Sequence, residues 1–348
     1  MSQFFPVGKA GGNANGYKVG DTINGQSLAL LHDKGLNTIW SYSGNSDDTY
    51  IADFALDSSG NVFIAFGGSN RICKILQSNQ LEAWNYNVAN VSMIRIDGNG
   101  DVVAAVGSQS TVPRGLIKIS GKDGTLVWGS LNSNTSSAYA TSICLDSSND
   151  VYEAIGFPSD GKTYYQLFKY SGETKKSLWG ITGVSLTDFG IVVADNNGYV
   201  YCAYFNYIAK YSSTGSLLQT YALKDKSIRL SLAGQSDLLR VSNYGRISRV
   251  ALNDMSTVWE VPVRPDGTIP SNSVLIANDK QDIYHISWSS STDGILRKLR
   301  FSDGETIWSY PITGGVIRSI ATDEIYISGN NDCKKMKYFD DSAYKITH

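Results

Sequence analysis

One short phrase recurs along the whole sequence. GKDGTLVWG, SGETKKSLWG and SDGETIWSY each join a polar turn to a short apolar run that ends in tryptophan. The tryptophans of this phrase are Trp40, Trp84, Trp128, Trp179, Trp259 and Trp308, and two more would fall at Gln219 and Ile346. Because a fixed internal period is the signature of repeat architectures, it restricts the fold more than any other feature of the chain.

A second phrase alternates with the first. DSSGNVFIA, DGNGDVVAA and DNNGYVYCA place a turn rich in Asp, Asn and Gly before an apolar strand, and these residues suit tight hairpins. The first apolar residue after each turn recurs every 38 to 49 residues, at Val62, Val102, Val151, Val200, Leu238, Ile283 and Ile325. Further alternating strands, such as YIADFAL and RICKIL, precede and follow this one. Four short strands per unit of about 44 residues predict the blade of a β-propeller.

The number of blades depends on residues 1–42. Seven units are plain over residues 43–348, and residues 26–42 supply the last two strands of another unit. Lys18 precedes Trp40 by 22 residues, the same gap as between Val62 and Trp84. We therefore favour an all-β single domain, 1–348, with eight four-stranded antiparallel blades and residues 1–42 as a divergent first blade. The alternative is seven blades, with residues 1–42 as an N-terminal arm or as closing strands.

The repeated aromatic residues are interpreted as structural. A tryptophan buries a large apolar body and keeps one polar contact for its N–H, so one per blade can fix the outer strand to the next blade. A second set holds one register of the second strand and is expected to fill the space between blades: Phe63, Tyr152, Tyr201, Tyr284 and Tyr326. An aromatic stack around a cofactor is the less favoured reading of the tryptophans.

Composition excludes several classes of function. The chain has 30 Lys+Arg against 32 Asp+Glu, a poor match for a nucleic-acid-binding protein. No run approaches the roughly 18 apolar residues of a membrane span, so we expect no membrane insertion. No charged leader precedes an apolar run, so no signal peptide is expected, and the chain is assigned to a virion or otherwise to the cytoplasm. The four widely spaced cysteines are interpreted as small buried hydrophobes.

No motif for catalysis or metal binding stands out. DGNGD begins like a calcium loop, but Val102 and Ser108 stand where that loop needs Gly and Glu, so a turn is favoured. The chain contains no P-loop, nucleophile elbow, HExxH motif or paired cysteines. The histidines lie far apart in sequence, at His32, His285 and His348. We therefore expect no catalytic residue, no metal ligand and no cofactor.

Some polar residues occupy unexpected positions. Glu153, Arg240 and His285 take the second-strand register where other units have apolar residues. They can mark a functional pocket, but local hydrogen bonding is the favoured interpretation. Three arginines, Arg95, Arg229 and Arg318, fall on innermost strands, where ordinary lining of the central channel is favoured over an anion site.

The connections between second and third strands are the candidate binding loops. GFPSDGKTYYQ and SWSSSTDG are rich in Ser, Gly and Tyr, a composition typical of adaptable binding surfaces. The aromatic side chains predicted there are Phe157, Tyr164, Tyr165 and Trp288, as anchors for a protein partner or a surface glycan. The alternative is a solvated loop with a locally packed aromatic.

A family resemblance rests on three of these stretches. LIKISGKDGTLVWG, KYSGETKKSLWG and LRFSDGETIWSY resemble the repeat of the pyrroloquinoline-quinone enzyme propellers. The resemblance covers most of the chain and implies the architecture. Quinone dehydrogenases of that family carry a calcium-ligand set and commonly adjacent cysteines, which this sequence lacks. Its non-catalytic branch, the outer-membrane assembly propellers, needs a lipoprotein signal, which is absent here too.

The function expected from the sequence is structural or binding. We predict a non-catalytic propeller, not an enzyme, that acts as part of a larger assembly. Its low charge and its loop composition favour a phage virion component, a tail or capsid-decorating protein. The alternatives are a channel-mouth enzyme, such as a quinone-dependent dehydrogenase, a lyase or a hydrolase, or a carbohydrate-binding propeller.

Overall fold

The fold is that of a computed structural model of the chain. It describes residues 4–6, 22–23, 26–32, 35–107, 114–132, 139–159, 162–185, 190–204, 206–225, 227–234, 236–264, 272–277, 281–288, 294–312, 316–321, 324–328, 332–339 and 343–347. Every regular element in these ranges is a β-strand, as the sequence predicted. Accordingly, none of these residues forms a helix with the length and apolarity that a membrane crossing requires.

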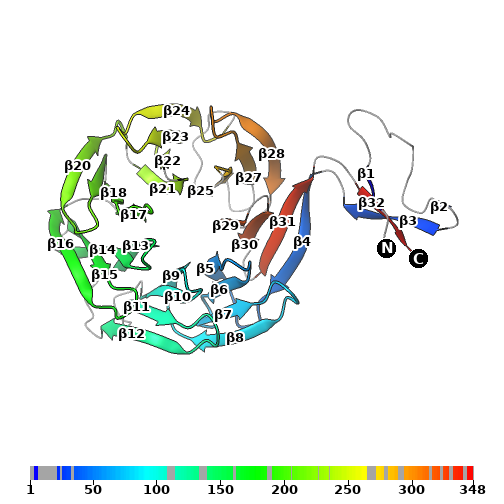
Figure 1. Ribbon diagram of the computed structural model, residues 1–348, viewed down its shortest axis with the longest axis horizontal. Helices are drawn as coiled ribbons and strands as arrows, with labels where there is room; N and C mark the ends of the chain where they lie inside the picture. Colours follow the sequence, from blue (N-terminus) through cyan, green and yellow to red (C-terminus); the bar gives the residue numbers. More distant parts are fainter. Residues whose placement is uncertain are drawn as a thin grey trace.

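Seven four-stranded antiparallel sheets are arranged as blades around a central axis (Figure 1). Blades 1 to 4 consist of β5 (Ile51–Leu56), β6 (Val62–Phe66), β7 (Arg71–Ile75), β8 (Glu82–Asn87); β9 (Val91–Ile96), β10 (Val102–Val106), β11 (Arg114–Ile119), β12 (Leu126–Asn132); β13 (Tyr139–Leu145), β14 (Val151–Ser159), β15 (Lys162–Tyr170), β16 (Ser177–Ser185); and β17 (Ile191–Ala194), β18 (Val200–Tyr204), β19 (Tyr207–Tyr211), β20 (Leu217–Ala222). Blades 5 to 7 consist of β21 (Ser227–Ala233), β22 (Asp237–Ser242), β23 (Arg246–Ala251), β24 (Thr257–Pro262); β25 (Asn272–Ala277), β26 (Ile283–Trp288), β27 (Gly294–Leu299), β28 (Thr306–Ile312); and β29 (Val316–Ala321), β30 (Glu324–Ser328), β31 (Asp332–Phe339), β4 (Gly35–Ser43).

The ring is closed by a strand from the N-terminal segment. β4 is the outer strand of blade 7 and pairs antiparallel with β31 from Gly35↔Phe339 to Ser43↔Asp332. β1 (Phe4–Pro6), β3 (Gln26–His32) and β2 (Thr22–Ile23) instead join β32 (Ala343–Thr347) in a separate four-stranded sheet. That sheet lies outside the ring, on the side of β4 and β31 (Figure 1).

The preference for eight blades was therefore wrong, and the alternative of seven blades with closing strands is the observed one. The physical reason lies in the last repeat. Its fourth strand, β32, leaves the ring to pair with β3, and β4 takes its place beside β31. The segment that resembled an eighth blade thus divides between the closure of blade 7 and the external sheet.

The second strand of each blade lies in the core. Every residue of β6, β10, β22 and β26 is buried, because these strands have neighbours on both sides within the blade and blades on both faces. Such strands read as continuous apolar runs, for example VFIAF, instead of alternating ones. The outer strands differ: in β8, exposed and half-buried residues alternate.

The Asp-rich turns fix the hairpins between first and second strands. Asp97 Oδ1 accepts hydrogen bonds from the backbone amides of Asn99 at 2.8 Å and Asp101 at 3.0 Å. Asp57, Asp146 and Asp195 accept the same pair of amides in their own turns. Asp97 Oδ2 lies 2.6 Å from Lys118 Nζ, so this carboxylate serves the turn and an ion pair. Among the described residues, no group of three or more His, Cys, Asp or Glu side chains could hold a metal ion.

Candidate functional site

A row of three side chains crosses each blade from the second to the fourth strand. Neighbouring positions on these strands hold an aromatic or apolar residue, a cation and a tryptophan. The rows with a tryptophan are Phe63–Lys74–Trp84, Val103–Lys118–Trp128, Tyr152–Lys169–Trp179, Leu239–Arg249–Trp259, Tyr284–Lys298–Trp308 and Tyr326–Lys335–Trp40. Where the first member is aromatic, its ring centroid lies 5.8 to 6.1 Å from that of the tryptophan.

The cation in the middle of the row is held by carboxylates and by a ring. In blade 3, Lys169 Nζ lies 3.0 Å from carboxylate oxygens of both Asp146 and Asp150, and 5.0 Å from the centroid of the Tyr152 ring. Burial alone would lower the pKa of Lys169, but hydrogen bonds to Tyr152 and the two carboxylates outweigh burial and raise it. The ammonium therefore stays charged within the blade.

The tryptophan closes the junction with the next blade. The indole N–H donates to a turn carbonyl between the third and fourth strands of that blade: Trp84 to Gly121 at 3.2 Å, Trp128 to Gly172 at 3.0 Å, Trp179 to Ser213 at 2.9 Å and Trp259 to Phe301 at 2.8 Å. At three of these junctions the cation of the row donates to the same oxygen, from Lys74, Lys118 and Arg249. Two donors on one carbonyl thus connect successive blades.

Blade 4 departs from this arrangement. Its row is Tyr201–Lys210–Gln219, and Gln219 is exposed. Lys210 Nζ lies 4.3 Å from the ring centroid of Tyr199 and 5.4 Å from that of Tyr201. The Asp195 carboxylate beside it is occupied by the Tyr201 hydroxyl, at 3.2 Å, and by two turn amides. Within the described part of the chain, Lys210 forms no ion pair, unlike the cations of the other rows.

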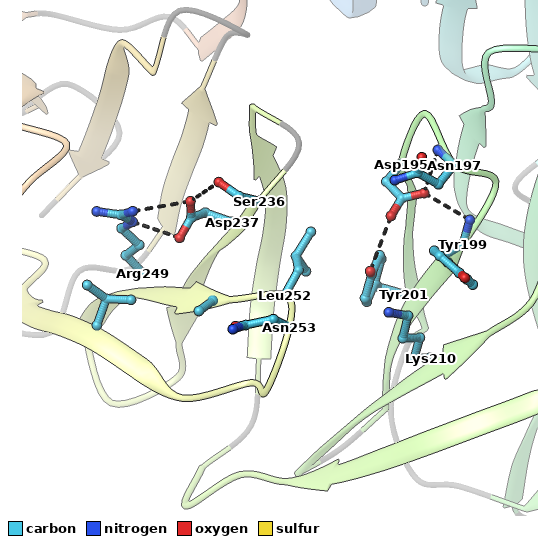
Figure 2. A pocket seen from close by; sticks show the side chains of 12 residues that line it. Asp195, Asn197, Tyr199, Tyr201, Lys210, Ser236, Asp237, Arg249, Leu252 and Asn253 are labelled. Atoms are coloured by element: carbon cyan, nitrogen blue, oxygen red, sulfur yellow. Dashed lines mark hydrogen bonds and ion pairs between the residues drawn. The ribbon is translucent and has the colours of Figure 1, made fainter.

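A cavity of about 480 Å³ opens where the blade 4 tryptophan is missing, and we call it the 4–5 cleft. One wall comes from blade 4 and the other from blade 5 (Figure 2). The residues that line it are Asp195, Asn197, Tyr199, Tyr201, Lys210, Ser236, Asp237, Arg249, Ala251, Leu252, Asn253 and Val258. On the blade 5 side, Arg249 is paired with Asp237 at 2.8 Å, so Lys210 is the cation without a carboxylate.

A second cavity, the 2–3 cleft, has a volume of about 460 Å³ and lies between blades 2 and 3. Its lining includes Trp128, Tyr170, Glu153 and Lys175. Glu153 is only 6% exposed. Burial lowers the pKa of Lys175, and the Glu153 carboxylate opposes that effect. A lysine of lowered pKa near a buried carboxylate is found both at functional sites and in structural pairs.

The three polar residues singled out in the second-strand register are not brought together. Glu153 lies in blade 3 and enters the 2–3 cleft. Arg240, in blade 5, donates to the Ser227 hydroxyl at 2.8 Å and forms an ion pair with Asp225. His285, in blade 6, is fully buried against Arg297, whose guanidinium donates to its Nδ1 at 3.4 Å. Burial first, and the Arg297 charge second, hold the pKa of His285 well below 6.5.

The candidate binding aromatics do not lie in loops, and that placement was wrong. Phe157 is in β14 and pairs with Tyr164 of β15, and Tyr165 pairs with Gly156, because this hairpin extends almost to its tip. Trp288 ends β26, is 6% exposed and packs with Tyr284 and Leu296. It is therefore no exposed anchor. The side chains of the other three aromatics, those of Arg318, His32 and His348, and the loop residues 108–113, 133–138, 265–271 and 289–293 lie outside the described residues.

The innermost arginines have ordinary surroundings. Arg95 donates to Asp53 at 3.1 Å and to the Ile94 carbonyl at 2.6 Å. Arg229 is exposed on β21.

Sequence reasoning missed the residues of the 4–5 cleft. The repeat marks Gln219 as a position where a tryptophan would fall, but no site was predicted there. The signal that could have located the cleft is that a missing indole removes both a large buried ring and a donor to the next blade. Lys210 and Tyr199 line the cleft at that junction.

Comparisons with known proteins show the fold. The chain matches no family model and no curated protein sequence. Among solved structures, streptogramin B lyase has a TM-score of 0.68 at 13% identity, covering 88% of this chain and 98% of its own. The WD40 repeats of RRP9 have a TM-score of 0.67 at 9% identity, covering 89% and 100%. BamB from Moraxella catarrhalis has a TM-score of 0.55 at 14% identity, covering 87% and 98%. The resemblance to quinone-enzyme repeats is not confirmed beyond the propeller fold.

These likenesses overturn one expectation from the sequence. The prediction that the chain is not an enzyme was wrong, because propellers of this fold include streptogramin B lyase, which is an enzyme. The same fold is also found in BamB and in a WD40 repeat domain. Because one fold serves both roles, the function of this chain depends on its individual clefts.

Proposed function

We propose that this propeller binds a protein partner and that the 4–5 cleft is its recognition site. The observation that carries the proposal is Lys210, whose ammonium lies over Tyr199 and Tyr201 at the edge of a cavity of about 480 Å³, without an ion pair in the described residues. Every other row places its cation within 4 Å of a carboxylate.

The chemistry of the cleft suits an inserted side chain of a protein. The half-buried Tyr199 offers a ring, Lys210 offers a charge, and the turn at Leu252 offers a backbone acceptor. Aromatic side chains that enter concave, partly desolvated pockets supply most of the binding energy of protein interfaces. The same fold in the WD40 repeats of RRP9 and in BamB is compatible with a binding role, although it does not specify a partner.

We place this binding in a larger assembly. The external sheet ends on β1 and β2, and such edge strands can pair with another chain. A virion, with this chain as a tail or capsid-decorating protein, remains the specific hypothesis, and a surface glycan remains the alternative ligand of the propeller. An antibody against the chain tests the hypothesis on particles purified from its source. Detection in intact particles at a fixed copy number is expected, and its absence from all particles would reject the virion assignment.

The binding proposal is tested with one variant in the cleft and one matched control. Lys210→Gln removes the charge that faces the cleft, and Lys122→Gln removes an exposed lysine from a turn of blade 2. Each immobilised protein is used to capture partners from extracts of its own source, after circular dichroism has shown equal melting. We expect partners that bind the control and wild type alike but bind Lys210→Gln at least tenfold less. Equal capture by all three proteins would contradict the cleft as the recognition site.

A second candidate function is acid–base catalysis in the 2–3 cleft. The observation that favours it is Lys175, whose pKa is lowered by burial, in the same cavity as the buried Glu153 carboxylate. Groups with shifted pKa values in a cavity are candidates for proton transfer. A panel of esters, lactones and glycosides tests this function. A turnover that Glu153→Gln abolishes without changing the melting temperature would favour catalysis over binding, and no turnover across the panel would leave the 2–3 cleft structural.

A further inference from the structure

The 4–5 junction lacks a donor that other junctions possess. Leu252 holds the turn position that corresponds to Gly121, Gly172 and Phe301, whose carbonyl oxygens each accept from a tryptophan and from a cation. The Leu252 amide donates to the Ser236 carbonyl at 2.9 Å. Across the described residues, neither Lys210 nor any other group donates to the Leu252 carbonyl oxygen.

The walls of the 4–5 cleft repeat the surroundings of a buried indole. In blades 1, 3 and 6 the aromatic residue of the row has a tryptophan ring at 5.8 to 5.9 Å. Tyr201 holds the same register in blade 4 and has Gln219 at the corresponding place. Tyr201 itself is only 1% exposed and packs with Met255 and Leu252, so the ring that the cleft offers is the half-buried Tyr199 beside it, together with the Lys210 cation and the Leu252 carbonyl.

One turn residue differs in a way that still permits an indole. Gly124, Gly215 and Gly304 let the tryptophan of the preceding blade approach within 2.7 to 2.8 Å of where a Cβ would lie. Blade 5 has Met255 at this position, with a φ of 59°, packed beside Tyr201 and Leu252. Lys175 takes the same position in blade 3 with a φ of 58°, and the N–H of Trp128 nevertheless reaches Gly172 at 3.0 Å.

The ring that would fill the cleft cannot come from this chain. Its seven tryptophans all lie in described strands, six in the outer-strand register and Trp288 in β26. None of them is exposed, since each is buried or half-buried in its own blade. A second copy of the protein therefore has no free tryptophan to offer, and the occupant must be a different molecule.

We infer that the 4–5 cleft binds a tryptophan side chain of the partner protein. The indole packs on Tyr199 beside Lys210, and its N–H donates to the Leu252 carbonyl in place of the missing internal donor. Tryptophan is enriched among the residues that dominate interfaces, and its ring buries a large apolar area together with one hydrogen bond. The inference rests on the proposed function, which identifies the 4–5 cleft as the recognition site. It adds the kind of side chain that this cleft selects.

The test uses N-acetyl-tryptophanamide as the probe and the full chain as the receptor. Saturation-transfer NMR and calorimetric titration compare wild type, Gln219→Trp and Gln219→Ala. Gln219→Trp places the repeat's own indole in the cleft, so we expect the affinity for the probe to fall at least tenfold. Gln219→Ala leaves the cleft open and should bind as wild type does. N-acetyl-leucinamide, which lacks the ring and the N–H, should bind wild type at least tenfold more weakly.

Several outcomes would overturn the inference. Equal probe affinity in wild type and a folded Gln219→Trp protein would do so, as would equal binding of the leucine and tryptophan amides. If Gln219→Trp does not fold, amide chemical shifts of wild type give the answer. Probe-induced shifts must then centre on Tyr199 and Leu252, and shifts centred elsewhere reject the site.

Failure of the inference is separable from failure of the proposed function. If the probe binds the cleft but capture of partners is unaffected by Lys210→Gln, the cleft selects indole and the partner docks elsewhere. If capture requires Lys210 while the probe does not bind, the cleft is the docking site and the selected side chain is not tryptophan.

Discussion

The indole N–H of Trp259 in blade 5 donates to the carbonyl oxygen of Phe301 in blade 6 at 2.8 Å, and Arg249 donates to the same oxygen at 3.1 Å. Two donors from one row thus hold the same carbonyl of the next blade. Because similar contacts recur around the ring, stability is distributed over the junctions. The one row without tryptophan, at Gln219, lies at the junction that contains the 4–5 cleft.

The first prediction concerns the tryptophan of a closed junction. Trp259 is 9% exposed, so Trp259→Ala should lower the free energy of unfolding by about 3–5 kcal/mol through the lost burial and the cavity left behind. Gln219→Ala is the matched control, since Gln219 is exposed in the same register and should change it by less than about 0.5 kcal/mol. Denaturant titration measures both. Equal effects of the two substitutions would show that the tryptophan does not secure the junction.

The second prediction separates a steric clash from backbone strain. Gly304 has a φ of 75°, and a Cβ there would lie 2.7 Å from Cε3 of Trp259. Gly100 has a φ of 84° with nothing within 4 Å of the same position. Gly100→Ala should cost about 1 kcal/mol from the left-handed backbone alone, and Gly304→Ala should cost at least 1 kcal/mol more. Thermal unfolding of both variants provides the comparison, and an equal loss would mean that the Trp259 ring moves aside freely.

The third prediction concerns closure of the ring by β4. Deleting residues 1–43 removes the outer strand of blade 7 and exposes the edge of β31, so we expect aggregation or loss of the cooperative unfolding transition. Deleting residues 1–34 removes β1 to β3 but retains β4, and the ring should melt nearly as in wild type. Size-exclusion chromatography and scanning calorimetry distinguish the two. A soluble protein with unchanged melting after the longer deletion would refute closure by β4.

The fourth prediction is a pH dependence caused by His285. Burial, together with the Arg297 charge, holds its pKa well below 6.5, so the folded protein keeps a neutral imidazole that the unfolded chain protonates. Burial first, and the Arg264 charge second, lower the pKa of Arg297, so Arg264 belongs to the same positive surroundings. Once the pH falls to the pKa that His285 has in the unfolded chain, the unfolded state binds more protons than the folded state. The free energy of unfolding must then decrease as the pH falls further.

Between pH 7.5 and 5.0 this single group can account for a loss of at most about 2 kcal/mol in the free energy of unfolding, a limit set by the unfolded pKa alone. His285→Gln removes the titration, and the other ionisable groups contribute alike to both proteins. The difference in unfolding free energy between wild type and His285→Gln should therefore shrink or reverse towards pH 5.0. A constant difference across this range would show that His285 takes up its proton in the folded state.

Much of the fold was predictable because the local sequence of each repeat predicts the strands of that repeat. The Asp turn at Asp97, the apolar second strand and the tryptophan of the outer strand all follow from local sequence. Less of the candidate site was predictable. The polar residue at position 153 was identified, but its neighbour Lys175 comes from a turn 22 positions away in sequence and meets it only through the hairpin of blade 3.

Local sequence determined which residues form strands and which side chains face the next blade, because hydrophobic period and turn chemistry act within a few residues of each other. The number of blades, and the hairpin that replaced the predicted loop around Phe157, were decided by strand pairing. β4 and β32 carry similar short patterns, and only tertiary geometry selects β31 as the partner of one and β3 as the partner of the other. The 4–5 cleft has the same origin: Gln219 marks a departure from the repeat in the sequence, but only the packing of blade 4 against blade 5 shapes the cavity at their junction.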